Sequence, residues 1–155
     1  MIKTLILVFA TSLWLVAGNI EVKKTDRCLI RQVEIYKHPT WIASASTRSK
    51  TVYFSSPKSM FEYYFQPIRW TSVGAINSKD ILSLKVTDYN TLDAIDAKKA
   101  FYVYGSNRTS VGGDDLPAFA TKKSAETFAQ KYNGKRVLAF DEISLALVNL
   151  INGRI

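Results

Sequence analysis

The clearest pattern of apolar and polar positions lies in residues 101–143. Residues 101–104 are aromatic and β-branched, which suits a half-buried strand, and turn-forming residues follow them. A second apolar run, 116–120, precedes Thr121, which can cap a helix whose apolar side chains share one face. An Asn-Gly pair ends that helix, and 136–140 resumes as a strand. The pattern therefore predicts a ββαβ unit.

The same pattern occurs earlier in the chain. Residues 54–64 align without a gap with the stretch that begins 65 positions later. Both stretches start with phenylalanine, carry serine or threonine at the helix cap and place apolar residues on one helix face. The alignment predicts an α+β fold with two tandem ββαβ half-domains, at about 40–88 and about 100–143. We expect a polar connection at 88–98, with room for a helical turn at 94–99, and a terminal helix at 144–150 that packs on the sheet.

Residues 1–18 have the pattern of a signal peptide, with Lys3 at the start, an apolar stretch at 4–16 and small residues after it. The apolar stretch is shorter than the roughly 20 residues that a membrane span needs. The sequence Val-Ala-Gly-Asn19 is similar to a lipoprotein cleavage box in which asparagine replaces the lipid-bearing cysteine, so no lipid anchor is expected there. The sequence predicts a periplasmic protein whose single domain covers 19–155.

The formal net charge of +8 favours acidic partners or anionic membrane faces. Lysine and arginine are not concentrated in blocks, and export argues against nucleic acid as a partner. Cys28 is the single cysteine, so no disulfide can form within the chain. In an oxidising compartment we expect this thiol to be buried, to bind a metal or to pair with a second chain.

Seven short motifs follow one another along most of the chain: His38-Pro-Thr-Trp-Ile-Ala, Phe54-Ser-Ser-Pro-Lys-Ser-Met-Phe, Val86-Thr-Asp-Tyr, Ile95-Asp-Ala, Phe101-Tyr-Val-Tyr-Gly-Ser, Leu116-Pro-Ala-Phe and Phe140-Asp-Glu-Ile. Their order and spacing resemble the NosL family, the nitrous oxide reductase accessory proteins. The resemblance implies a periplasmic copper(I) carrier that helps deliver copper to nitrous oxide reductase. It also implies a fold like that of organomercurial lyase, and a shared fold alone does not confer that enzyme's chemistry.

The chain departs from the family at the positions that the resemblance marks as metal ligands. Where the family typically has Cys-Pro-Val-Cys-Gly-Met, residues 28–33 read Cys-Leu-Ile-Arg-Gln-Val. Arg31 and Val33 therefore replace the second cysteine and the methionine. Where the family typically has Gly-Pro-Met-Gly, residues 110–113 read Ser-Val-Gly-Gly, so Gly112 replaces a second methionine. Only the first cysteine of this pattern is kept.

The soft side chains available for copper(I) in residues 19–155 are Cys28, His38 and Met60. Cationic neighbours of Cys28 would favour its thiolate, and the alternative is a small buried apolar residue. His38 precedes a proline, where an imidazole more often stacks or caps a turn. Met60 falls on the inward face of the first predicted helix, so core packing explains its position.

An enzyme is not expected. Cys28 and His38 lie ten residues apart in a segment that looks exposed, and no third group completes a nucleophile and base. Asp114 and Asp115 are adjacent, so their side chains should point apart, which does not suit paired acid and base chemistry. The glycine-rich stretch lacks the spacing of a phosphate loop. We interpret it as a flexible loop that lines the site through Gly105, Ser106, Gly112 and Gly113.

Two functions stay open at this point. The first is a periplasmic copper(I) metallochaperone with a reduced ligand set, whose partner is a protein of the copper pathway or of nitrous oxide reductase maturation. The second is a metal-free docking protein that keeps the NosL scaffold and uses its basic, aromatic-rich surface. A homodimer in which each chain contributes Cys28 is compatible with the first function.

Overall fold

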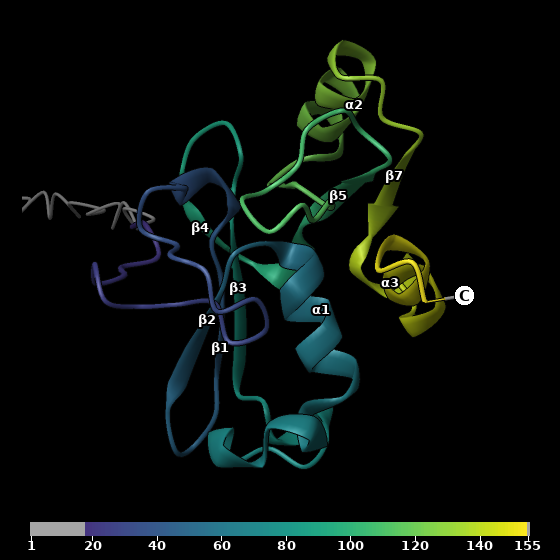
Figure 1. Ribbon diagram of the computed structural model, residues 1–155. Helices are drawn as coiled ribbons and strands as arrows, with labels where there is room; N and C mark the ends of the chain where they lie inside the picture. Colours follow the sequence, from purple (N-terminus) through teal and green to yellow (C-terminus); the bar gives the residue numbers. More distant parts are fainter. Residues whose placement is uncertain (1–17, 155) are drawn as a thin grey trace, which may run out of the picture.

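The computed structural model describes residues 18–154, so the expected signal peptide lies outside the described residues except for Gly18. The described chain forms two antiparallel sheets with three α-helices packed on them or on one another (Figure 1). This agrees with the α+β class expected from the sequence. Within residues 18–154, none of the helices has the length and apolar character needed to span a bilayer.

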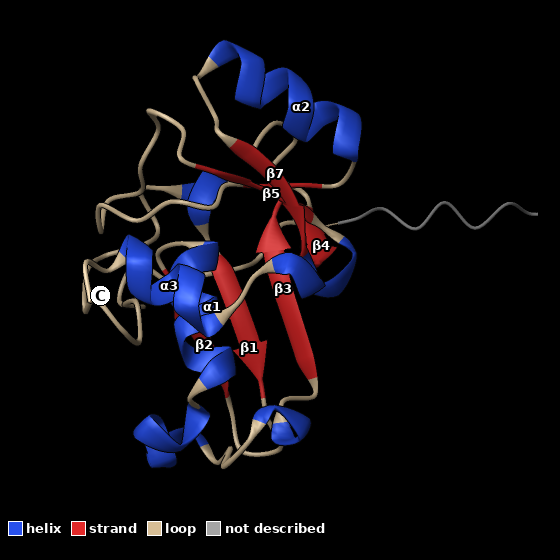
Figure 2. Cartoon of the chain, turned by 90° about the vertical axis from the view of Figure 1, so that its right-hand side faces the viewer, coloured by secondary structure: helices blue, strands red, loops and turns tan. Residues whose placement is uncertain are grey.

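The first sheet contains the strands β1 (Ala43–Ser46), β2 (Thr51–Phe54), β3 (Ser83–Thr87) and β4 (Ala94–Asp96), in the spatial order β2-β1-β3-β4. Side chains alternate along β3, so that Leu84 and Val86 are buried while Lys85 is exposed. Helix α1 (Pro57–Phe65) covers the apolar face of this sheet (Figure 2). Its cap residue is Ser56, as predicted, whose hydroxyl accepts a hydrogen bond from the Ser59 amide at 3.1 Å.

The second sheet contains β5 (Phe101–Tyr104), β6 (Ala118–Phe119) and β7 (Arg136–Ala139), in the order β6-β5-β7. Helix α2 (Lys122–Lys131) packs on it and begins after the predicted cap Thr121, which accepts a hydrogen bond from the Ser124 amide at 3.2 Å. Phe128 of α2 and Phe119 of β6 meet with their ring centroids 4.9 Å apart. They form a small apolar cluster beneath α2.

Helix α3 (Leu145–Ile151) packs on α1, so the expectation that it packs on the sheet is wrong. As a result α1 lies between the first sheet and α3, and seven of its nine residues are buried. Even its charged residues Lys58 and Glu62 are enclosed. The stretch 88–98 also differs from the expected polar connection, because it contains β4, in which Ile95 pairs with Val86 of β3.

Five 3-10 segments complete the described chain: η1 (Pro39–Trp41), η2 (Pro67–Val73), η3 (Ser78–Asp80), η4 (Ala97–Lys99) and η5 (Phe140–Glu142). The segments η2 and η3 follow α1 and form the end of the molecule opposite α2 (Figure 1).

Candidate functional site

Cys28 belongs to a closed turn at residues 28–33. The Cys28 amide donates to the Val33 carbonyl at 3.0 Å, and the Gln32 amide donates to the Cys28 carbonyl at 2.9 Å. Cys28 is fully buried in the main core, so the impression of an exposed segment at this residue is wrong. Its Sγ accepts a hydrogen bond from the Arg31 amide at 3.3 Å. The thiol is therefore packed in the core and hydrogen-bonded. This matches the alternative in which Cys28 is a small buried residue.

The Arg31 side chain forms a forked contact with a carboxylate. Its Nη2 lies 2.8 Å from Asp114 Oδ1, and its Nε donates to Asp114 Oδ2 at 3.4 Å. The same carboxylate binds Lys58 Nζ at 2.8 Å and accepts hydrogen bonds from the hydroxyl groups of Ser56 and Ser59 at 3.0 and 2.7 Å. A guanidinium–carboxylate pair thus stands where the resemblance places the second cysteine.

Gly112 lies directly against this pair. A Cβ atom added to Gly112 would meet Arg31 Cγ at 3.2 Å, Ser55 Oγ at 3.3 Å and Asp114 Oδ2 at 3.4 Å. The loop and the turn that carry the replaced ligand positions are therefore neighbours, as the resemblance implies. Ser55 Oγ is buried and has no hydrogen-bond partner among the described residues.

The other three loop residues are placed differently. The Gly105 amide donates to Asp115 Oδ2 at 2.5 Å, and a Cβ at Gly105 would meet the Lys135 side chain. The Ser106 hydroxyl bonds within its own turn, to Arg108. A Cβ at Gly113 would point into open space. Gly112 is therefore the loop residue whose placement connects it with the turn at 28–33.

The contacts of Arg31 continue into a larger set of polar groups, which is buried around Lys58 and reaches solvent at Arg154, whose side chain is 47% exposed. Lys58 Nζ donates to Asn152 Oδ1 at 2.6 Å and lies 3.5 Å from Glu62 Oε2, which accepts from Asn152 Nδ2 at 3.0 Å. Arg154 Nη1 binds the other oxygen of Glu62 at 3.0 Å. We refer to this set as the buried charge cluster, and its members are Arg31, Lys58, Glu62, Asp114, Asn152 and Arg154.

Both carboxylates of the cluster are held in the ionised form. Burial alone would raise the pKa of Asp114, but hydrogen bonds from Arg31 and Lys58 outweigh burial and lower this pKa below its ordinary value. Burial also opposes ionisation of Glu62, and the Asn152 amide together with the cations lowers the pKa of that group. The hydrogen bond to Asp114 raises the pKa of Arg31. At neutral pH the cluster therefore holds two carboxylate anions, which face Arg31, Lys58 and Arg154.

Asp115 lies beside the cluster but outside it. Its carboxylate accepts hydrogen bonds from the amides of Gly105 and Leu116, whereas Asp114 faces Arg31 and Lys58. The expectation that these adjacent side chains point apart is confirmed. Burial raises the pKa of Asp115 despite the two backbone hydrogen bonds.

The remaining candidate ligands do not complete a metal site. Met60 is fully buried in α1 and belongs to the main core, as expected. His38 is half-buried at the start of η1, where its amide donates to the Ile35 carbonyl at 2.9 Å. Residues 18–154 contain no group of three or more His, Cys, Asp or Glu side chains placed to hold a metal ion. A single buried thiol beside a guanidinium does not fit copper(I), which prefers several soft donors.

Sequence reasoning missed most of the buried charge cluster. Lys58 and Glu62 are spaced four residues apart, as in an ordinary surface pair on a helix. The one signal in the sequence was that Lys58 and Glu62 lie in a helix whose other residues are apolar on several sides, which indicates a helix that is buried all round. Asn152 gave no signal, because its role depends on the packing of α3 against α1.

The sequence profile of the NosL family matches residues 19–148, and the chain belongs to this family. The crystal structure of the copper chaperone NosL from Shewanella denitrificans superposes with a TM-score of 0.67 and 24% identity, covering 84% of this chain and 98% of that chain. This likeness shows the fold. The solution NMR structure of the apo-NosL protein from Achromobacter cycloclastes gives a TM-score of 0.48 and 25% identity, covering 68% of this chain and 87% of that chain. A comparison with curated protein sequences gives no significant match.

The NosL relative is named a copper chaperone and not an enzyme, which agrees with the expectation that this chain is not an enzyme. At the positions that the resemblance marks as metal ligands, this chain keeps Cys28 and has Arg31, Val33 and Gly112 at the other three.

Proposed function

We propose that this chain is a periplasmic accessory protein of the NosL family that acts by docking to a partner of the copper pathway. In this proposal it does not carry copper(I) on the ligand set of its family. The observation that supports it is the Arg31–Asp114 pair, at 2.8 Å, in the place of the second cysteine.

The physical argument rests on charge and donor number. Copper(I) is stabilised by two to four soft donors, and position 31 presents a cation instead of a thiolate. The neighbouring carboxylate is already bound by Arg31, Lys58 and two serine hydroxyl groups, so it has no free role as a ligand. Recruiting Cys28 would require breaking its packed turn and placing a metal cation close to the positive charge of Arg31.

Copper(I) carriage through Cys28 is the second candidate function. It is favoured by the position of Cys28, which lies in one turn with Arg31 and Val33. Arg31 of this turn contacts Gly112, so the positions that the resemblance marks as ligands lie near one another. In that case the partner would be a protein that receives copper, such as one involved in nitrous oxide reductase maturation.

A copper(I) titration against a competing chelator separates the two candidates. We expect the protein that consists of residues 19–155 to leave copper(I) with the chelator. The variant Cys28→Ser should behave in the same way. A matched positive control is the triple variant Arg31→Cys, Val33→Met, Gly112→Met, because shortening Arg31 removes the Cγ atom that lies 3.2 Å from the new side chain. This variant should gain one copper(I) per chain. Tight binding by the wild type that is lost in Cys28→Ser would establish the carrier function instead.

The periplasmic location in this proposal is supported by the signal-peptide pattern of residues 1–18, most of which lie outside the described residues. Asn19 in place of the lipid-bearing cysteine supports release without a lipid anchor. Osmotic-shock fractionation tests both points, and recovery of an acylated form in membranes would contradict them.

We also propose that the two ββαβ units are copies of one module. The strand order β2-β1-β3 has the same form as β6-β5-β7. Phe54 pairs with Ala43, the first residue of β1, and Phe119 pairs with Phe101, the first residue of β5. These matched registers support the alignment of residues 54–64 with the stretch 65 positions later.

A further inference from the structure

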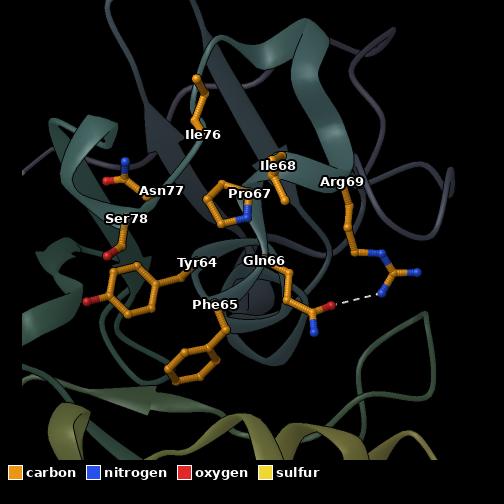
Figure 3. Close-up of a pocket in the computed structure, with 9 residues that line it drawn as sticks. All are labelled: Tyr64, Phe65, Gln66, Pro67, Ile68, Arg69, Ile76, Asn77 and Ser78. Atoms are coloured by element: carbon orange, nitrogen blue, oxygen red, sulfur yellow. Dashed lines mark hydrogen bonds between the residues drawn. The ribbon is translucent and has the colours of Figure 1, made fainter.

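The end of α1 and the segments after it line an open hollow of about 800 Å³ (Figure 3). A second hollow of about 320 Å³ lies along β3 and β4, and Tyr64 lines both. We refer to the two together as the α1-end groove. The residues that matter for the argument are Tyr64, Phe65, Ile68, Arg69, Ile76 and Leu82.

Large apolar side chains are concentrated at this groove. Ile68, Ile76 and Leu82 are 57%, 68% and 63% exposed, and they are three of the five large exposed apolar residues in the described chain. Ile68 and Ile76 line the first hollow, and Leu82 lines the second. Single exposed apolar residues are ordinary, but a group of them along adjoining hollows marks an interaction site. Figure 3 shows Ile68 and Ile76 on the same side of the hollow as Pro67, with the Tyr64 and Phe65 rings on another.

The charged groups around the groove are mostly cationic. Arg69, Lys85 and Lys98 line it, and Lys79 follows the lining residue Ser78. None of these four forms an ion pair within residues 18–154. Two acids accompany these cations. Asp96 lines the second hollow and accepts from the amide of Lys98, and Asp80 accepts from the amides of Ile76 and Asn77, so the cations outnumber the carboxylates. The first hollow is therefore mainly apolar inside, the second is lined by polar and apolar side chains alike, and the charged groups around the two carry a net positive charge.

We propose that the α1-end groove binds an acidic polypeptide segment of the partner that also carries large apolar side chains. This inference rests on the proposed function, in which the chain acts by docking. Apolar side chains of the segment would cover Ile68, Ile76 and Leu82, and its carboxylates would meet the unpaired cations. A concave surface suits an inserted side chain better than a flat bilayer. A second copy of this chain is disfavoured, because a protein of net charge +8 would bring like charge to a cationic rim.

Selection from a random peptide library displayed on phage tests the proposal, with the folded wild-type protein as bait. We expect the selected peptides to be enriched in Asp and Glu together with Leu, Ile, Phe or Trp. A selected peptide should bind about tenfold more weakly to Ile76→Ser and to Ile68→Ser than to the wild type. Its affinity for the wild type should fall as the salt concentration is raised. Leu150→Ser is the matched control, because Leu150 is 45% exposed on α3 and lies outside the groove; it should bind like the wild type.

Charge reversal gives the second arm. The double variant Lys79→Glu, Lys85→Glu should lose the acidic peptides, whereas Lys123→Glu on α2 should retain them. The proposal is overturned if no peptide is selected, if the selected peptides are not acidic, or if their binding ignores the groove variants. Recruitment of the protein to anionic vesicles, or its dimerisation through Ile76, would likewise overturn it in favour of a membrane or a second copy. If the peptide experiment fails and the protein binds no copper(I), the groove proposal is wrong but the proposed docking function is not contradicted. If copper(I) binds through Cys28, the proposed docking function is wrong whatever peptides are selected.

Discussion

Lys58 is the most tightly enclosed charge in the described chain. Its side chain is fully buried between α1, the Asp114 loop and the chain after α3, and Nζ reaches Asp114, Glu62 and Asn152. A buried cation is tolerated only when its partners replace the water it has lost. Lys58 therefore joins three segments of the chain through one ammonium group.

We predict that Lys58→Met lowers the free energy of unfolding by about 3 to 5 kcal/mol, because it leaves two buried carboxylates with fewer partners. Urea denaturation measures this change. Lys122→Met is the control, since Lys122 makes an exposed contact with Glu126 at 3.9 Å and should change stability by only about 0.5 kcal/mol. A loss of similar size in both variants would show that the buried contacts of Lys58 contribute no more to stability than an exposed ion pair.

The lowered pKa of Asp114 predicts a dependence of stability on acid. A carboxyl whose pKa is lower in the folded state stabilises the protein above its unfolded value, here 3.8, and this contribution is lost as pH falls through the folded pKa. Asp114→Asn should therefore be much less stable than the wild type at neutral pH, and the difference should shrink as pH falls below about 4. Unfolding free energies measured across this range test the prediction, and a constant difference would contradict it.

The sequence identified the positions of the candidate site better than their environment. The motif comparison marked Cys28, Arg31 and Gly112, and the structure places Gly112 against Arg31. It could not show that Arg31 is held by Asp114, because the two are 83 positions apart and an aspartate in a glycine-rich loop reads as a surface residue. Buried polar clusters of this kind become visible only when the tertiary contacts are known.

Among the elements, the two long helices differ in how their first turns are bonded. The Ser56 hydroxyl accepts from the Ser59 amide and also donates to the buried Asp114 carboxylate at 3.0 Å. The Thr121 hydroxyl accepts from the Ser124 amide in an exposed position. The cap of α1 is thus part of the buried charge cluster, whereas the cap of α2 is local.

We predict that Thr121→Ala costs about 1 kcal/mol of unfolding free energy, the usual loss for a helix cap. Ser56→Ala should cost about 2 to 3 kcal/mol, because it removes a cap and a hydrogen bond to a buried carboxylate. Parallel urea titrations of the two variants measure the difference. Equal losses would mean that the Ser56 contact with Asp114 contributes nothing to stability.

The pattern of the sequence located the elements that local signals define. Both helix caps, the strand at 101–104 and the end of α2 depend on residues within a few positions of one another, so they could be predicted. β4 was missed because only Ile95 among its three residues is a large apolar residue, and its pairing with β3 fixes it as a strand. The packing of α3 on α1 was likewise beyond a local pattern, which shows an apolar face but not what covers it.

At the scale of the whole molecule, one apolar core extends across both sheets. Phe61 of α1 packs against Tyr102 of β5 and Phe140 of η5, with ring centroids 5.1 and 5.0 Å apart. We call residues 39–96, which carry the first sheet, the first unit, and residues 101–139, which carry the second sheet, the second unit. The main core includes residues of both units, and only the small cluster under α2 is separate. Tyr89 contacts both Trp41 and Phe128, which ties that cluster to the first unit as well.

This continuity predicts that the protein unfolds in a single cooperative transition. Within residues 18–154 both tryptophans, Trp41 and Trp70, lie in the first unit, so their fluorescence reports on that unit, while far-ultraviolet circular dichroism reports on the whole chain. The two signals should give the same midpoint in urea. Phe128→Ala, in the second unit, should shift both by the same amount, corresponding to a loss of about 3 to 5 kcal/mol. If the variant lost part of its circular dichroism signal at a urea concentration where the tryptophan signal was unchanged, the two units would unfold separately, and the shared core would not couple them.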